Sequence, residues 1–104
     1  MFGFSTVAVS GNSMSPTYND GDFLLIRSLS GQRHTLLIDQ VYLVEDPSRE
    51  GVKLLKRLKE TRMEHGIMRY WVEGDSKESN DSRSWGWLEG DKFVGKVLLR
   101  YRKR

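Results

Sequence analysis

The sequence contains no cysteine and only two histidines, and these absences exclude several kinds of active site. Without cysteine there is no disulfide, no thiolate nucleophile and no Cys-based metal site. A Ser-His-Asp triad needs a histidine beside its serine, but His34 and His65 both stand in polar stretches typical of solvated loops. Neither has an acidic residue at the spacing of a zinc site, so we expect no metal and no other cofactor.

Long apolar segments are also missing. No apolar run approaches the roughly 20 residues of a membrane-spanning helix, and the N-terminus lacks the basic and apolar regions of a secretory signal. We therefore expect a cytoplasmic protein without a transmembrane segment, and contact with a membrane stays open. A fragment separated from an N-terminal anchor would have the same sequence, and it would be membrane-associated or extracytoplasmic.

Excess positive charge is confined to one end of the chain. The net charge is +3, and the tail Arg100–Arg104 carries enough basic residues to leave the remainder close to neutral. A basic surface for nucleic acid is thus only weakly supported, and we expect no nucleic-acid partner. With 104 residues, of which 30% are charged and 38% hydrophobic, the chain has the size and composition of one globular domain spanning 1–104.

Short segments rich in β-branched and aromatic residues recur along the chain between turn signals. Strands are expected at 5–10, 23–27, 41–44, 67–73 and 93–101. The segment 52–59 is read as a further strand, although its leucines would also fit one helix face. The segment 74–91 is polar and is expected to be a long loop, which in a small domain is often functional. The chain is therefore predicted to be a mainly β, barrel-type domain with no convincing helix.

The turn between the first two strands carries a candidate nucleophile, Ser13. The turn is Ser10–Thr17 (SGNSMSPT), and the signal Asn19–Asp22 (NDGD) closes it. Pro16 disfavours a helix after Ser13, so the hydroxyl would be presented from a turn. The pattern is not the G-x-S-x-G elbow, because Ser15 stands in place of the second glycine. Ser13 is thus either a nucleophile of another type or an ordinary turn residue.

A serine without a histidine can be activated by a neutral lysine, whose pKa is lowered by burial. In a strand, Lys56 shares its face with Leu54 and Leu58, so it meets this requirement. Lys53 falls on the opposite face from Leu54 and is expected to be solvated. On the pattern alone, an ordinary lysine on an edge strand is the more frequent explanation for Lys56 too.

The polar loop contains a dense cluster at Gly74–Arg83 (GDSKESNDSR). In a functional arrangement, Ser79 would orient a neutral lysine. Asp81 and Arg83 are two residues apart and fall on one side of an extended segment, where their pairing would make the loop rigid. A solvated polar turn would have the same composition.

In this order the segments resemble the bacterial type I signal peptidase family of Ser/Lys proteases, and the similarity spans most of the chain. The matching segments are Ser10–Thr17 with Gly21-Asp22, Val41–Val44 with Asp46-Pro47, Leu55–Arg57, and Gly74-Asp75 through Ser79, Asp81–Arg83 and Gly86. The resemblance implies a serine endopeptidase on a compact, signal peptidase-like and LexA-like β core.

The resemblance also implies roles for individual residues. Ser13 would be the nucleophile, with its backbone N–H in the oxyanion hole, and Lys56 would be the general base. The supporting residues would be Ser79, Asp81, Arg83 and Asp75. The residues in contact with a substrate bound as an extended peptide would include Met14 and Asn12.

The sequence departs from the family pattern in four respects. It has no transmembrane helix ahead of the first strand and no second β domain inserted after Lys56. Gly11 stands where some members place a serine that donates to the oxyanion hole, and Ser76 replaces the usual asparagine. A short form of this kind, with the ending 93–101, most resembles the nickel-type superoxide dismutase maturation proteases. The expected partner is therefore a precursor protein that loses an N-terminal leader or propeptide, and the nickel would belong to that substrate.

Three alternatives remain beside this hypothesis. The chain could be a general signal peptidase-like domain that cleaves exported preproteins. A repressor-type, self-cleaving Ser/Lys protease would require a cleavable segment ahead of the first strand, where the given sequence has only a few residues. A non-catalytic β-barrel module for peptide or nucleic acid would not need Ser13, and its binding to nucleic acid would depend on salt.

Overall fold

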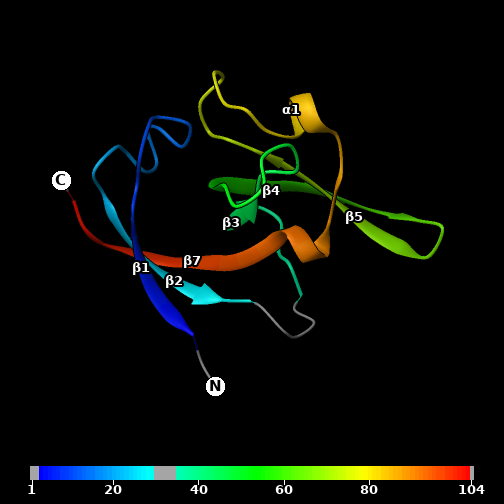
Figure 1. Cartoon of the computed structure of the whole chain (residues 1–104), viewed down its shortest axis with the longest axis horizontal. Coiled ribbons are helices and arrows are strands. Elements are labelled where there is room, and N and C mark those ends of the chain that lie inside the picture. The colour runs from blue at the N-terminus through cyan, green and yellow to red at the C-terminus, as the bar shows by residue number, and fades with distance from the viewer. Residues whose placement is uncertain (1–2, 30–34, 104) are drawn as a thin grey trace.

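The computed structural model describes residues 3–29 and 35–103, and seven strands within these ranges form one antiparallel sheet (Figure 1). The strands are β1 (Phe4–Ala8), β2 (Phe23–Ser28), β3 (Val41–Glu45), β4 (Lys53–Glu64), β5 (Ile67–Glu73), β6 (Leu88–Glu89) and β7 (Phe93–Arg102). Across the sheet they follow the order β1-β2-β7-β3-β4-β5-β6. A one-turn helix, α1 (Ser82–Trp85), and a short 3-10 helix, η1 (Gly90–Lys92), lie between β5 and β7.

The prediction of a mainly β domain is confirmed, and the sheet is open rather than closed into a barrel, with β1 and β6 at its two ends. Five of the predicted strands are present within two residues of their expected bounds, and the sixth, predicted at 52–59, extends five residues further, to Glu64. The ambiguous segment 52–59 belongs to β4, so the helical alternative is wrong there. The first half of β4 pairs with β3 and the second half with β5, and Leu58 is buried.

The polar segment 74–91 contains more structure than its sequence indicates. It holds α1, β6 and η1, none of which was expected. These elements have two to four residues each, which is too short for a hydrophobic period to be visible. Asp81 caps α1 by accepting a hydrogen bond from the Arg83 backbone N–H.

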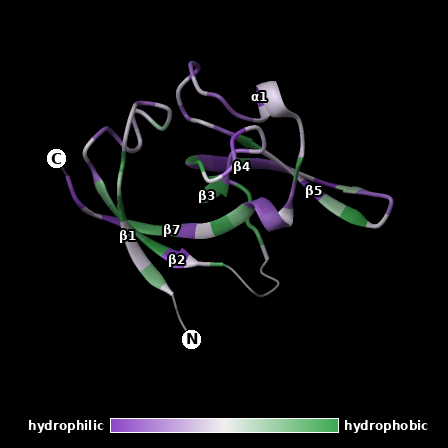
Figure 2. Cartoon of the chain, in the orientation of Figure 1, coloured by the Kyte–Doolittle hydropathy of each residue, from purple (hydrophilic) through white to green (hydrophobic). Residues whose placement is uncertain are grey.

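Hydrophobic side chains form two cores on opposite faces of the central strands. The first core consists of Leu29, Tyr42, Val44, Leu58, Val72, Leu88 and Phe93. The second core consists of Val9, Met14, Leu24, Ile26, Val41 and Val97. Successive residues of β3 point to opposite faces, so Val41 packs in the second core and Tyr42 in the first. This two-sided burial explains the uninterrupted apolar run of β3, which Figure 2 shows as hydrophobic.

Beyond the cores, the end of β4 and the start of β5 form a hairpin that projects from the rest of the sheet (Figure 1). His65 lies in its turn with a positive φ of 51°, well within the exposed part of the hairpin. The other histidine, His34, lies outside the described residues. Among residues 3–29 and 35–103, no helix is long and apolar enough to cross a membrane.

Candidate active site

The loop between β1 and β2, residues 9–22, carries Ser13 and is called the nucleophile loop here. Two backbone hydrogen bonds close its base: Val9 N–H donates to the Asp22 carbonyl and Gly21 N–H donates to the Val9 carbonyl, both at 2.8 Å. Gly21 has a φ of 89°, which a side-chain-bearing residue would adopt at a cost. Inside the loop, Gly11 N–H donates to the Asp20 carboxylate at 2.9 Å. The serine is therefore carried by a closed, internally bonded loop.

Ser13 is held on two sides. The next residue, Met14, is 1% exposed and packs in the second core. The Ser13 carbonyl accepts a hydrogen bond of 2.9 Å from the backbone N–H of Ser76, which belongs to the polar loop after β5. The Ser13 hydroxyl has no hydrogen-bond partner among the described residues, and catalytic hydrogen bonds often form only when substrate is present.

Lys56 lies on β4 with its side chain in the interior. The residue is 1% exposed and is paired in register with Tyr42 of β3, in the middle of the sheet order. Lys56 is therefore not an ordinary, solvated lysine, whereas Lys53 is exposed as expected. β4 is not an edge strand of the whole sheet, although its first half pairs with β3 on one side only. Burial lowers the pKa of Lys56 below its ordinary value, and the positive charge of Arg83 lowers it further. Asp81 and Asp46 act in the opposite direction, and the net shift favours the neutral amine.

Ser79 connects Lys56 to a carboxylate. Its hydroxyl accepts a hydrogen bond from Lys56 Nζ at 3.2 Å and another from Gly74 N–H at 3.1 Å, and it donates its only proton to Asp81. Because that proton is already used, Ser79 can act only as an acceptor toward Lys56. A neutral Lys56 amine therefore spends an N–H on Ser79 and keeps its lone pair for another hydroxyl.

Asp81 is the permanent acceptor in this arrangement. Arg83 donates to it from Nη2 at 2.6 Å and from Nε at 3.0 Å, and Gly74 N–H donates at 2.7 Å. Burial alone would raise the pKa of Asp81, but the hydrogen bonds from Arg83, Ser79 and the backbone outweigh it and hold the pKa far below its usual range. The expected pair with Arg83 is present, and it keeps Asp81 ionised.

Asp75 makes a second link, between the strand of Lys56 and the nucleophile loop. It accepts two hydrogen bonds from Arg57, from Nε at 2.9 Å and from Nη2 at 2.8 Å. It also accepts a hydrogen bond of 2.6 Å from the Thr17 hydroxyl. The hydrogen bond from Arg57 is the main cause that lowers the pKa of Asp75. A two-point arginine–carboxylate contact fixes orientation as well as distance.

The segment Gly74–Ser76 thus touches both halves of the site. The backbone N–H of Gly74 bonds Ser79 and Asp81, and the N–H of Ser76 bonds the Ser13 carbonyl. A Cβ on Gly74 would lie 2.3 Å from Ser79 Oγ and 2.5 Å from the Ser13 carbonyl oxygen. These two oxygens are therefore less than 5 Å apart. Only glycine permits the two loops to approach so closely.

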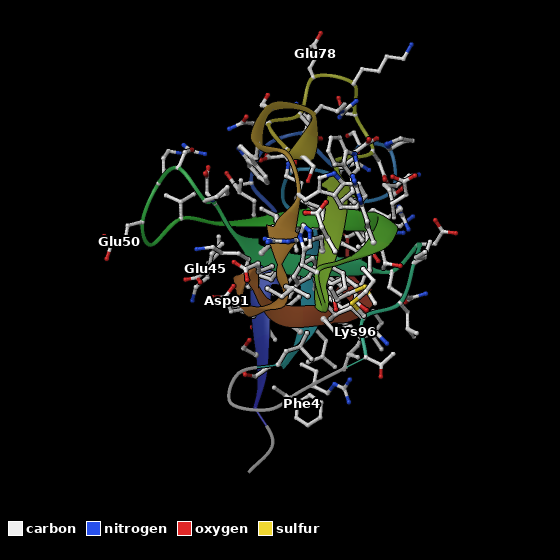
Figure 3. All side chains as sticks on the ribbon, turned by 90° about the vertical axis from the view of Figure 1, so that its right-hand side faces the viewer. Phe4, Glu45, Glu50, Glu78, Asp91 and Lys96 are labelled. Atoms are coloured by element: carbon white, nitrogen blue, oxygen red, sulfur yellow. The ribbon has the colours of Figure 1, made fainter. Side chains whose placement is uncertain are left out.

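Most of the predicted residues gather in one place, namely Ser13, Lys56, Ser79, Asp81, Arg83 and Asp75. Of the residues expected to contact substrate, Asn12 is exposed, whereas Met14 is buried in the second core. Figure 3 shows Glu78 at the outer end of the polar loop, pointing away from the sheet, so the tip of that loop is not part of this cluster.

Three residues that hold the site were given no role from the sequence: Arg57, which bonds Asp75, and two others. Thr17 is bonded to Asp75 through its hydroxyl, and Arg100 of β7 bonds the Thr17 carbonyl at 3.0 Å. Arg100 stands in a basic tail, where the pattern alone indicates only solvated charge. Among the described residues, no group of three or more histidine and acidic side chains is arranged to hold a metal ion.

No protein-family model matches this chain, and no curated protein matches it. The function is therefore inferred from the chemistry of the site, since a mainly β fold by itself is compatible with many activities.

Proposed function

We propose that this chain is a serine endopeptidase that uses Ser13 as nucleophile and Lys56 as general base. The observation that carries the proposal is the buried Lys56 amine, whose pKa is lowered and whose N–H is donated to Ser79. A solvated lysine needs no such partner, and a buried lysine with a lowered pKa is suited to take a proton near neutral pH. The closed loop that presents Ser13 lies against the same polar segment.

The reaction follows the two-step course of covalent catalysis. The neutral Lys56 amine takes the Ser13 proton while Ser13 Oγ attacks the peptide carbonyl carbon. The resulting ammonium gives this proton to the leaving amine as the C–N bond breaks, which leaves an ester on Ser13. Water then loses a proton to Lys56 and attacks the ester, and the proton returns to Ser13 as the acid leaves.

The negative charge that develops on the carbonyl oxygen needs a donor. The Ser13 backbone N–H makes no hydrogen bond among the described residues, so it is free for this purpose. One such donor is typically worth roughly 3–4 kcal/mol of barrier. Gly11 has no side chain to add a second donor from that position.

The substrate is proposed to bind as an added strand along the first half of β4. Residues Lys53–Lys56 pair with β3 on one side. On the other side, the described strand pairing begins only at Arg57, opposite Glu73. An extended peptide can pair with such an edge through its backbone. Leu55 of this edge packs against the second core, to which Met14 also belongs, so the peptide would run beside the nucleophile loop.

Within this reaction class, the proposed substrate is a precursor protein that loses an N-terminal leader or propeptide. The segment 93–101 resembles that of the maturation proteases of nickel-type superoxide dismutase, so a precursor of that enzyme is the first substrate to test. This choice rests on the resemblance alone.

The decisive experiment measures cleavage of such a precursor by mass spectrometry. Ser13→Ala and Lys56→Met are each expected to abolish cleavage, and the wild-type rate should rise with pH as Lys56 loses its proton. Lys59→Met, which removes an exposed lysine from the second half of the same strand, outside the proposed substrate edge, is the matched control and should cleave normally. Wild-type cleavage by Ser13→Ala would rule out the mechanism.

A further inference from the structure

Arg100 on β7 contacts three residues of the nucleophile loop. Its Nη1 donates to the Thr17 carbonyl at 3.0 Å and to Asp22 Oδ2 at 3.2 Å. Its guanidinium also lies 6.0 Å from the centre of the Tyr18 ring, within the range of a cation–π contact. A residue near the end of the chain therefore holds the loop that presents Ser13.

A β-bulge points Arg100 toward that loop. Ile26 of β2 is opposite Val97 and Leu25 is opposite Leu99, so β7 has one extra residue at Leu98. As a result Arg100 is opposite Leu24, on the face of the second core. In a regular ladder Leu99 would take this place and Arg100 would face the other way. Bulges beside active sites commonly redirect a side chain in this manner.

The contacts of Arg100 fall on the part of the loop that determines where Ser13 lies. Thr17 is held at its carbonyl by Arg100 and at its hydroxyl by Asp75. Between Ser13 and Thr17 the chain is a hydrogen-bonded turn, in which Tyr18 N–H donates to the Met14 carbonyl at 3.0 Å. Such a turn transmits a displacement of Thr17 to Ser13.

Asp22 is the second residue of the nucleophile loop to which Arg100 donates a hydrogen bond. Asp22 is 4% exposed, and its Oδ2 also accepts a hydrogen bond of 2.9 Å from the Asn19 N–H. The Asp22 carbonyl closes the base of the loop with Val9. Arg100 therefore bonds the loop at its closing turn and at Thr17 simultaneously.

We propose that Arg100 is a positioning residue, which holds the nucleophile loop so that Ser13 meets the Lys56 amine. The proposal rests on the proposed Ser13/Lys56 peptidase activity. Arg100 acts through Thr17 and Asp22 and not on the substrate, so its loss should slow the chemical step and leave substrate binding unchanged.

The test compares Arg100→Met with Arg102→Met. Arg102 is on the same strand and carries the same charge, but its guanidinium lies over the Phe23 ring at 5.5 Å. We expect Arg100→Met to lower kcat by about tenfold to a hundredfold with KM changed by less than about twofold. Arg100→Lys should recover part of kcat, because an ammonium can still bond the Thr17 carbonyl. Arg102→Met should leave both constants unchanged.

A second measurement, hydrogen–deuterium exchange, does not depend on catalysis. Arg100→Met should speed exchange of the Tyr18 and Gly21 amides, whose hydrogen bonds lie within the loop, and Arg102→Met should not. Unchanged loop exchange in Arg100→Met, equal loss of kcat in both variants, or a rise in KM alone would each overturn the proposal. If Arg100→Met does not fold, Arg100→Lys is put through both measurements.

The two proposals can fail separately. If the wild-type protein shows no cleavage that depends on Ser13, the proposed function has failed. The exchange measurement then still decides whether Arg100 holds the loop. Faster exchange confined to residues 9–22 in Arg100→Met supports this role of Arg100, and the absence of faster exchange overturns it.

Discussion

Asp81 and Asp75 belong to the same polar loop and each is paired with an arginine, but the two pairs differ in reach and in burial. Asp81 is fully buried and pairs with Arg83, two residues further along the chain. Asp75 is 17% exposed and pairs with Arg57, 18 residues away on β4. The first pair is local and can form within the loop alone. The second forms only when strand and loop are already together.

The two pairs accordingly do different things. The Asp81–Arg83 pair determines where the Ser79 proton lies. An ionised Asp81 accepts the hydrogen bond of the Ser79 hydroxyl, so Ser79 is left to accept a hydrogen bond from Lys56. The Asp75–Arg57 pair determines the distance between β4 and the nucleophile loop, because Asp75 bonds both Arg57 of β4 and Thr17 of that loop. A lysine base needs both conditions: the correct protonation state, and a hydroxyl within reach.

The largest effect is expected from Gly74→Ala, which disturbs both Ser79 and the contact between the polar loop and the nucleophile loop. Its Cβ would lie 2.3 Å from Ser79 Oγ and 2.5 Å from the Ser13 carbonyl oxygen, and a backbone oxygen cannot move away cheaply. We expect cleavage to be lost and the free energy of unfolding to fall by about 1–3 kcal/mol, as measured by denaturant unfolding.

The matched control for this variant is Gly90→Ala. A Cβ on Gly90 meets only a Tyr70 ring atom at 3.5 Å, which is an ordinary contact, so activity should be retained. Wild-type activity in Gly74→Ala would show that the close approach of the two loops is not required.

Asp81→Asn should have the next largest effect and a characteristic pH signature. The amide removes the charge that holds the Ser79 proton, so kcat should fall about tenfold to a hundredfold. Asp81 is a cause that raises the pKa of Lys56, so its removal lowers that pKa further. The rise of the rate with pH should therefore move to lower pH. A profile that does not move would contradict the contact between Asp81 and the base.

Asp75→Asn should have a smaller effect without that signature. The ion pair with Arg57 is lost, but the amide oxygen can still accept from Thr17. We expect kcat to fall about tenfold and stability to fall by about 1 kcal/mol, because the pair is partly exposed. Asp75 is not among the causes that shift the pKa of Lys56, so the pH at which the rate rises should stay the same. An equal shift in both variants would remove the distinction between the pairs.

The smallest effect is expected in acid. The folded-state pKa of both Asp81 and Asp75 is lowered, so their stabilisation is present above the unfolded aspartate pKa of about 3.9 and is lost as the pH falls through the folded values. The wild-type protein should lose stability progressively below about pH 4. Asp81→Asn should flatten this dependence, measured by urea unfolding at several pH values. An unchanged slope would show that the pKa of Asp81 is not lowered in the folded protein.

Much of the fold could be predicted from local sequence, and particular residues show why. Val41–Val44 and Ile67–Glu73 have the composition of strands, and the NDGD turn closes the nucleophile loop where the sequence indicates it. The open sheet, α1 and β6 could not be predicted. The order β2-β7-β3 brings together strands far apart in the chain, and elements of two to four residues carry no periodic signal.

The site shows the same division. The expected pairing of Asp81 with Arg83 is present, but the segment is not extended: Asp81 is the N-cap of α1 and Arg83 lies within that helix. The partner of Asp75 could not be derived from spacing, because Arg57 is on another strand. The position of Arg100 could not be predicted for a related reason, because a bulge in β7 decides on which face of the sheet its side chain lies.

By itself, then, the amino-acid sequence determined the strands, the closing turn around Ser13, the local ion pair of the polar loop and the leucine-rich setting of Lys56. Only the tertiary structure decided that Lys56 is buried, that Ser79 is its partner and that Arg100 points toward the nucleophile loop. The physical reason is that backbone preference and turn formation depend on neighbours in the chain. Burial and a lowered pKa depend on neighbours in space, which for Lys56 come from β3 and from the polar loop.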